Sequence, residues 1–355
     1  SMRSFTMILS RRRLLATAAA ALAAPHVMTS SRARAATSIV ATTYPGSFDE
    51  AFRAVMGPAF QKASGADVTF TPLLGVDQIG KIQASRNAPP FDVVLFDEGP
   101  LIPAIASGVI EKFPTEASKS FAQIPQPFRH PDGYAPVITV QLIGIAYNPK
   151  KITTPPTSWE DLWKPEYKGR VGITGMGSSL GTAFMVEIAK LNGGSETNLE
   201  PAFEAIKKLL PNVGAIAASP GALATLFQQG EIDIAFNFWN NVALLAAKGV
   251  DIAFAKPKSG AVIIRSSAQI VKNNQDPKLV LDYLDTVMSA EAQKGIEAAP
   301  WVMMPTNKNV ALTGANLTVA KSVDDLIASN VLLDWTKFQH MRGEWITRFN
   351  KDVKI

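Results

Sequence analysis

The sequence predicts an α/β fold with two lobes, each containing a mainly parallel sheet flanked by helices. Strand-like and helix-like segments alternate from residue 38 to residue 100, a pattern typical of parallel strands joined by helical crossovers. The alternation resumes between residues 171 and 255. Two short connections, residues 144–172 and 256–260, follow the first and second block, as expected of a chain that leaves one lobe and returns to it.

The first block places three polar or aromatic residues at the ends of predicted strands. Strands are expected at 38–43, 67–73 and 91–96, and helices at 48–63 and 77–85. A turn near Tyr44 follows the first strand, and Asp97 and Glu98 open a sharp turn into a further helix. Because open α/β sheets bind ligands beyond the carboxyl ends of their strands, these three residues are candidate ligand contacts.

The first connection begins with a strand at 137–147, which Asn148-Pro149 ends because proline cannot donate to a ladder. Ser158, with Asp161 three residues later, is a helix N-cap signal. Residues 170–173 then open a new strand. This proline-containing segment is interpreted as a crossing between lobes, and an ordinary β–loop–α–β connection is the alternative.

The second block and the C-terminal part continue with both kinds of element. Strands are expected at 171–174, 232–238, 251–255 and 262–264, and helices at 182–191, 200–210, 220–229, 242–248, 276–288 and 290–298. Helices are expected to continue to the end of the chain, with Trp335 and Trp345 as core anchors. No internal repeat is visible.

The connection also carries a family resemblance. The strings YNPKK, PTSWEDLWKPEY and KGRVGI occur in this order between Tyr147 and Ile173. They resemble the inter-lobe segment of periplasmic solute-binding proteins that serve ABC importers, especially the spermidine/putrescine-binding and ferric-iron-binding branches. The similarity runs from about Ser38 to about Asn307. It implies a type II periplasmic-binding-protein fold, a monomer without cofactor or catalysis, and delivery of a small solute to a membrane permease.

The expected domains follow from this resemblance and from the leader. They are a signal peptide at 1–35, lobe 1 at 36–143 plus 258–305, lobe 2 at 144–257, and C-terminal helices at 306–355 packed on lobe 2. Arg11-Arg12-Arg13 resembles a twin-arginine export signal, with cleavage near Ala35. The apolar run at 14–24 is too short to span a membrane, so a periplasmic protein without a stable membrane anchor is expected. A basic, disordered tail is the alternative.

Composition excludes several function classes. The net charge of +5 includes six arginines in residues 1–35, which contain no acid, so the remaining chain carries −1. Nucleic-acid binding therefore has no support from charge. The absence of cysteine excludes disulfides, thiol catalysis and cysteine-based metal sites. The 355 residues, 47% hydrophobic, can form one large or two medium domains.

Two polar segments of the second lobe are candidate ligand contacts. Ser178 and Ser179 lie in the string GSSLGT before a predicted helix, where free N–H groups and a positive dipole end suit an anion. Simple N-capping is the alternative. Trp239 and Asn240 follow a strand and resemble the loop whose indole packs on the ligand in polyamine-binding relatives. A core tryptophan is the alternative. Trp301 is a further candidate to pack the ligand's carbon skeleton.

The charged candidates point to different solutes. In polyamine-binding relatives an aspartate occupies the position of Ser266, whereas here Arg265 precedes a serine. A guanidinium attracts a carboxylate, so the preferred solute carries a carboxylate or is a zwitterion. A surface salt bridge is the alternative for Arg265. Asp97 and Glu98 instead suit an amine, which keeps polyamine binding as a second hypothesis. The favoured alternative for these two acids is a charge pair at a helix start, stabilised by the helix dipole.

Metal binding and catalysis have weak signals. None of the five tyrosines are adjacent, unlike those of the ferric-binding branch, and the three histidines show no ligand spacing. No G-x-S-x-G elbow or cysteine nucleophile is present. No metal and no cofactor are expected, and a secreted enzyme on the same scaffold is the remaining alternative function.

Overall fold

The computed structural model describes residues 37–354. The predicted signal peptide and its cleavage site near Ala35 lie outside these residues. The α/β class is confirmed, because strands and helices alternate through most of the described chain. Its twelve strands belong to one connected sheet with the order β2-β1-β3-β10-β5-β8-β6-β7 along its main path.

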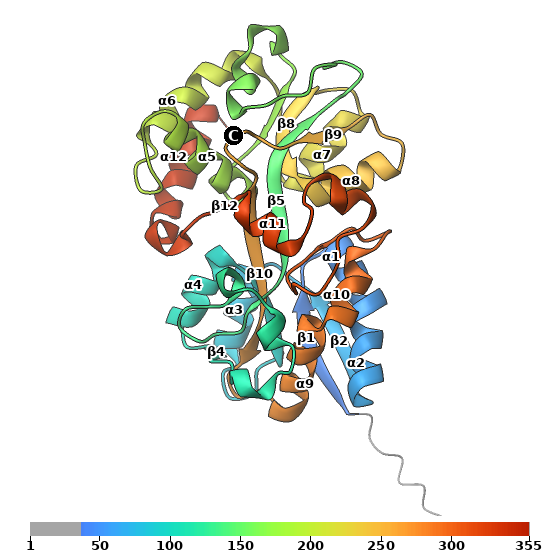
Figure 1. Ribbon diagram of the computed structural model, residues 1–355. Helices are drawn as coiled ribbons and strands as arrows, with labels where there is room; N and C mark the ends of the chain where they lie inside the picture. Colours follow the sequence, from blue (N-terminus) through green and yellow to red (C-terminus); the bar gives the residue numbers. More distant parts are fainter. Residues whose placement is uncertain (1–36, 355) are drawn as a thin grey trace, which may run out of the picture. The chain divides into compact units, whose positions relative to one another are not determined.

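The outer strands of this sheet are parallel and the central ones are antiparallel. Strand β1 pairs in parallel with β2 and β3, and β6 pairs in parallel with β7 and β8. Their bounds are Ser38–Thr43 (β1), Asp67–Pro72 (β2), Val93–Asp97 (β3), Val171–Thr174 (β6), Val213–Ala217 (β7) and Ile234–Phe238 (β8). The long strands β5 (Val137–Tyr147) and β10 (Val262–Val271) lie antiparallel to each other and join the two parallel parts (Figure 1). Short strands pair with them: β4 (Ile110–Glu111), β9 (Ala253–Ala255), β11 (Met304–Pro305) and β12 (Val331–Leu332).

Most helices follow the sequence-based expectation. Their bounds are α1 (Ser47–Ala51), α2 (Gly57–Ser64), α3 (Gly75–Ala84), α4 (Glu98–Ala106), α5 (Ser179–Leu191), α6 (Glu200–Leu209), α7 (Pro220–Gln228), α8 (Trp239–Ala247), α9 (Pro277–Met288), α10 (Ala290–Glu297), α11 (Val323–Ala328) and α12 (Arg342–Val353). The helix expected at 48–63 has a π-helical turn at Phe52–Met56 between α1 and α2. Ser158 and Asp161 form the predicted capping box of a short 3-10 helix.

The described chain contains two large hydrophobic cores, and β5 contributes to both. Ile138, Val140 and Leu142 pack with β1, α2 and α9 in the first core. Further along the same strand, Ile143 and Ile145 pack with β6, α5 and α6 in the second core. A smaller third core lies under α3 and α4. The chain therefore passes from one large core to the other within β5, close to residue 143.

The proline-containing segment after β5 has a different role from the predicted crossing. Its buried residues Ile152, Trp159 and Leu162 all belong to the second core. It is therefore the ordinary β–loop–α–β connection that was the alternative interpretation. The return passage is also made by a strand: β10 is ten residues long, rather than the three expected.

The C-terminal part divides between the two cores. Leu312, Val323 and Leu326 pack in the first core, whereas Trp335 and Trp345 pack in the second, where both are buried. The two tryptophans are thus confirmed as core anchors. Helix α12 lies along α6, and its Arg348 forms an ion pair with Glu200 of that helix.

Candidate functional site

Asp97 lies where three separate elements meet. It is the last residue of β3, and its Oδ1 accepts a 2.7 Å hydrogen bond from the Ser266 hydroxyl on the neighbouring strand β10. Its Oδ2 accepts a 3.4 Å bond from the Ser179 hydroxyl at the start of α5. Its backbone N–H donates to the Tyr44 hydroxyl at 2.6 Å. The structure therefore brings together three predicted site residues, Tyr44, Asp97 and Ser179, with Ser266 as a fourth; we call these four the Asp97 cluster.

The electrostatics of the Asp97 cluster are dominated by burial. Burial raises the pKa of Asp97, although the hydrogen bonds from Ser266, Ser179 and Tyr44 and the charge of Arg342 counteract it. Burial also raises the pKa of Tyr44 well above 10, and the Asp97 charge adds to this effect, so Tyr44 is a neutral hydroxyl at physiological pH. The cluster therefore presents one carboxylate among hydroxyl groups.

Arg342 is the arginine whose positive charge lowers the pKa of Asp97. Sequence reasoning missed this residue. It is the first residue of α12, and it donates to Thr182 Oγ1 at 3.2 Å and to the Met176 carbonyl at 3.3 Å. Within residues 37–354 no carboxylate lies within 4 Å of it. Burial lowers its pKa and the charge of Asp97 raises it, which indicates that the two groups are near each other.

Ser178 and Ser179 have different partners although they are adjacent. Ser178 is the N-cap of α5, and its hydroxyl accepts from the Gly181 N–H at 3.2 Å. This arrangement satisfies one of the free donors at the helix start. The Ser179 hydroxyl instead faces Asp97. Of the two serines, only Ser179 is therefore directed at the cluster.

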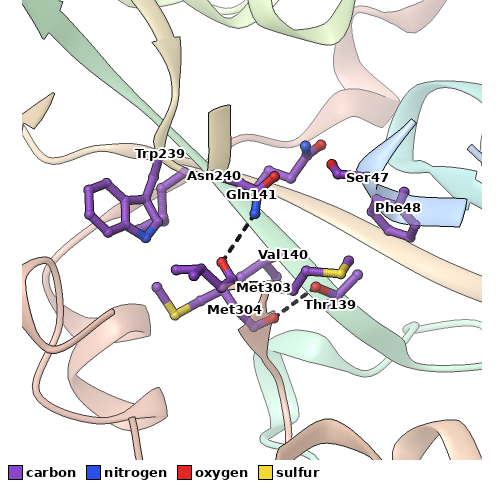
Figure 2. A pocket seen from close by; sticks show the side chains of 11 residues that line it. Ser47, Phe48, Thr139, Val140, Gln141, Trp239, Asn240, Met303 and Met304 are labelled. Carbon is purple, nitrogen blue, oxygen red and sulfur yellow. Dashed lines mark hydrogen bonds between the residues drawn. The ribbon is translucent and has the colours of Figure 1, made fainter. Parts of the chain in front are cut away.

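A small hollow lies beside α1 and α8 on the strand β5. Figure 2 shows Trp239 and Asn240 on one side of it and Ser47 and Phe48 on the other, with Gln141 between them. Met303 and Met304 also line it, and we call this space the front hollow. Its volume is about 10 Å³, which is about enough for one water molecule.

The first turn of α8 is bonded to the segment that follows α10. Trp239, 8% exposed, donates from Nε1 to Asn316 Oδ1 at 2.8 Å and packs edge-on against Phe254. The Asn240 amide donates to the carbonyls of Trp301 and Val302 at 3.0 and 3.2 Å. The Trp301 side chain is half-buried against the first core. Trp239 and Asn240 thus line the front hollow, whereas Trp301 contributes a backbone carbonyl beside it.

Glu98 and Arg265 form a separate ion pair on the other face of the sheet. Arg265 donates to the Glu98 carboxylate from its backbone N–H at 2.9 Å, from Nε at 2.8 Å and from Nη2. Because successive side chains of a strand point to opposite faces, Arg265 points away from the side on which Ser266 meets Asp97. Burial raises the pKa of Glu98 to about 7, and Arg265 counteracts this rise.

A larger space, the rear hollow, lies beside this ion pair. Its lining includes Glu98, Leu101, Ile102, Arg265, Leu333 and Trp335, and its volume is about 530 Å³. Glu98 and Arg265 pair with each other there, about half of the lining residues are apolar, and Arg129, His130, Asp132 and Asp334 also line the space. Arg265 therefore pairs with Glu98 and not with Ser178 or Ser179. The adjacent residues Asp97 and Glu98 have different partners, because the Asp97 side chain bonds to Ser266 and Ser179.

Other kinds of site find no support in the described chain. No group of three potential ligands among histidine, aspartate and glutamate is close enough to hold a metal ion within residues 37–354. None of the helices in that range combines the length and the apolar character that crossing a membrane requires. We therefore take the Asp97 cluster together with the front hollow as the candidate site.

Comparisons with known proteins identify a family for most of the chain. Residues 77–338 match a family model described as bacterial extracellular solute-binding protein. The spermidine/putrescine-binding periplasmic protein of Escherichia coli K12 is 28% identical over 207 residues, covering 57% of this chain and 54% of that protein. A putative 2-aminoethylphosphonate-binding periplasmic protein of Salmonella paratyphi A is 27% identical over 191 residues, with 53% and 52% coverage. The chain spans about half the length of these relatives.

Solved structures with the same fold cover nearly all of the described chain. A putative extracellular solute-binding protein from Bordetella parapertussis superposes with a TM-score of 0.78 at 23% identity, covering 89% of this chain and 98% of that one. An ABC transporter protein from Clostridium perfringens gives a TM-score of 0.76 at 22% identity, with 89% and 99% coverage. At this level of identity, the likeness concerns the fold.

Proposed function

Because the chain belongs to the family of bacterial extracellular solute-binding proteins, we propose that it captures a small organic solute in the periplasm and delivers it to the permease of an ABC importer. The observation that carries this proposal is the location of the Asp97 carboxylate and the front hollow beside β5 and β10, the two strands that join the large cores. Ligand sites at such junctions can close by movement of the flanking bodies.

Capture requires movement of these parts, because the front hollow in its present form has room for about one water molecule. In the proposed cycle β5 and β10 bend, the two cores separate, and a solute enters beside Asp97. Closing buries the solute between α1 and Asp97 on one side and α5 and α8 on the other. The solute favours the closed form only to the extent that it binds that form better than the open one.

The preferred solute is a zwitterion. Its amine would bind the Asp97 carboxylate, which has two hydroxyl donors and, within residues 37–354, no cation within 4 Å. Its anionic group would lie at the start of α5, near Ser178, Ser179 and Arg342. Sequence reasoning assigned that anion to Arg265, but the guanidinium of Arg265 is occupied by Glu98. Tyr44, Trp239, Asn240 and Trp301 would surround the carbon skeleton.

Polyamine binding is the second candidate function. It is favoured by the same carboxylate and by the relatives that are named for spermidine and putrescine. A polyamine would use Asp97 and not Glu98, which is paired with Arg265 on the other face.

Isothermal titration with 2-aminoethylphosphonate, spermidine, putrescine and succinate tests these alternatives. Binding of 2-aminoethylphosphonate, and none of succinate, would support the zwitterion, whereas binding of spermidine or putrescine alone would favour the polyamine. Binding of succinate alone would contradict the assignment of Asp97 as the anchor of the solute. Mass spectrometry of the solute after incubation tests the enzyme alternative, because a binding protein must return it unchanged.

A further inference from the structure

Gln141 is the amide residue in the middle of the long strand β5, and it is one of the residues that line the front hollow. Every other side chain of β5 from residue 138 to residue 147 is buried, whereas that of Gln141 is only partly buried. Within residues 37–354, its side-chain amide neither donates nor accepts a hydrogen bond. Figure 2 shows this side chain between Asn240 and Ser47, two residues that belong to the starts of different helices.

The register of the sheet places Gln141 on the same face as the Asp97 cluster. Gln141 pairs with Ile264, and Thr139 pairs with Ser266, the residue that donates to Asp97. Residues two apart on a strand share a face, so Gln141 and Ser266 face the same side. Strands β5 and β3 are two positions apart in the sheet, roughly 10 Å, so Gln141 and Asp97 would meet different parts of one solute.

Closure on an apolar surface would leave this amide without a partner. A buried amide without hydrogen bonds is destabilising, whereas one that is paired is not. The side chain offers two N–H donors and one carbonyl acceptor and carries no charge. A solute that fills the front hollow therefore needs a polar group at this position.

We propose that Gln141 is a specificity-determining residue that forms hydrogen bonds with a second polar group of the solute, distant along its carbon chain from the amine at Asp97. This inference rests on the proposed function and narrows it to chain-like solutes with polar groups at two separated positions. Solutes that have an amine and only an apolar tail would be rejected, because they leave the amide unpaired.

The test compares Gln141→Leu and Gln141→Asn with the wild-type protein by isothermal titration of spermidine and 2-aminoethylphosphonate. Loss of the amide should weaken binding of the active probe on the order of tenfold or more. Gln141→Asn keeps the amide one methylene further from the solute and should give a smaller loss. The matched control is Gln61→Leu on the exposed surface of α2, which should leave affinity unchanged.

The outcomes separate this inference from the function on which it rests. A probe that binds wild type and Gln141→Leu equally, with unfolding temperatures also equal, would overturn the inference and leave solute capture intact. A wild-type protein that binds neither of these probes nor putrescine would overturn this inference together with the two proposed solute classes. If Gln141→Leu does not fold, Gln141→Asn decides: unchanged affinity in that variant counts against a contact with the amide, and weaker binding at an unchanged unfolding temperature supports it.

Discussion

Replacing Arg265 by methionine tests whether this residue supports the fold or holds the solute. Methionine keeps the apolar stem and the backbone N–H, but Glu98 loses the two N–H bonds from the guanidinium. Each bond to a charged group contributes about 1.5–3 kcal/mol, and breaking one side of a buried ion pair costs about 3–5 kcal/mol. Because the Arg265 side chain is 23% exposed and that of Glu98 11%, water compensates part of the loss, and we expect about 3 kcal/mol.

The loss in Arg265→Met should depend on pH in a defined direction. Burial raises the pKa of Glu98, and removing Arg265 removes the charge that counteracts this rise. A carboxyl whose pKa is higher in the folded state binds more protons there, so stability falls as pH rises from about 4.5. In the wild type this fall ends near pH 7, and in the variant it continues to higher pH. The deficit relative to wild type should therefore be smaller at pH 5 than at pH 8.

Urea unfolding followed by circular dichroism at both pH values measures this deficit. Lys278→Met is the control, because it removes an exposed ion pair with Asp282, and exposed pairs contribute little to stability. Solute affinity, measured by titration, should stay within about threefold of the wild-type value. Unchanged stability in Arg265→Met combined with lost solute binding would refute the separation of the two faces.

Three further predictions concern other parts of the protein. Affinity for spermidine should fall as pH drops from 8 toward about 4, because a carboxyl with a raised pKa, such as Asp97, is protonated at a higher pH than usual. Measured by titration, Asp97→Asn should bind spermidine more weakly, and its affinity should change less with pH. Asn316→Ala leaves the Trp239 indole N–H without its acceptor and removes a donor to Glu297. It should lower the free energy of unfolding, measured in urea, by about 1–3 kcal/mol. A loss below about 0.3 kcal/mol would contradict the hydrogen bond between Trp239 and Asn316. Gly181→Ala places a Cβ 2.0 Å from the Gly175 carbonyl oxygen, so it should lower the free energy of unfolding by about 3 kcal/mol or more. Its control is Gly80→Ala in α3, which has open space and should raise that free energy by about 0.5–1 kcal/mol. Equal unfolding midpoints for these two variants would be inconsistent with the described start of α5.

Local signals predicted much of the fold. Gly65 ends α2 with a positive φ of 71°, and Ser158 forms the capping box with Asp161, because turns and caps depend on residues a few positions apart. The junction of the cores was harder to predict. The paired lengths of β5 and β10 depend on partners more than a hundred residues away, and no local pattern indicates them.

The face of Arg265 was also not readable from the sequence. Strand β10 is uniformly apolar before this residue and has two successive serines after it, so it lacks the alternation that would identify a solvent face. A shift of one residue decides whether a side chain faces Asp97, as Ser266 does, or Glu98. Arg342 is 77 positions later in the last helix, and only the folded chain brings it near Asp97. A signal did exist for Gln141, because it is the single amide within a mostly apolar central strand.

Titration of Asp97→Asn and Arg265→Met with whichever of spermidine, putrescine and 2-aminoethylphosphonate binds the wild-type protein tests the central claim most directly. If the solute lies on the face shared by Asp97 and Gln141, Asp97→Asn should lose affinity on the order of tenfold or more, and Arg265→Met should retain it. Retained binding in Asp97→Asn together with lost binding in Arg265→Met would place the solute on the opposite face and contradict the account.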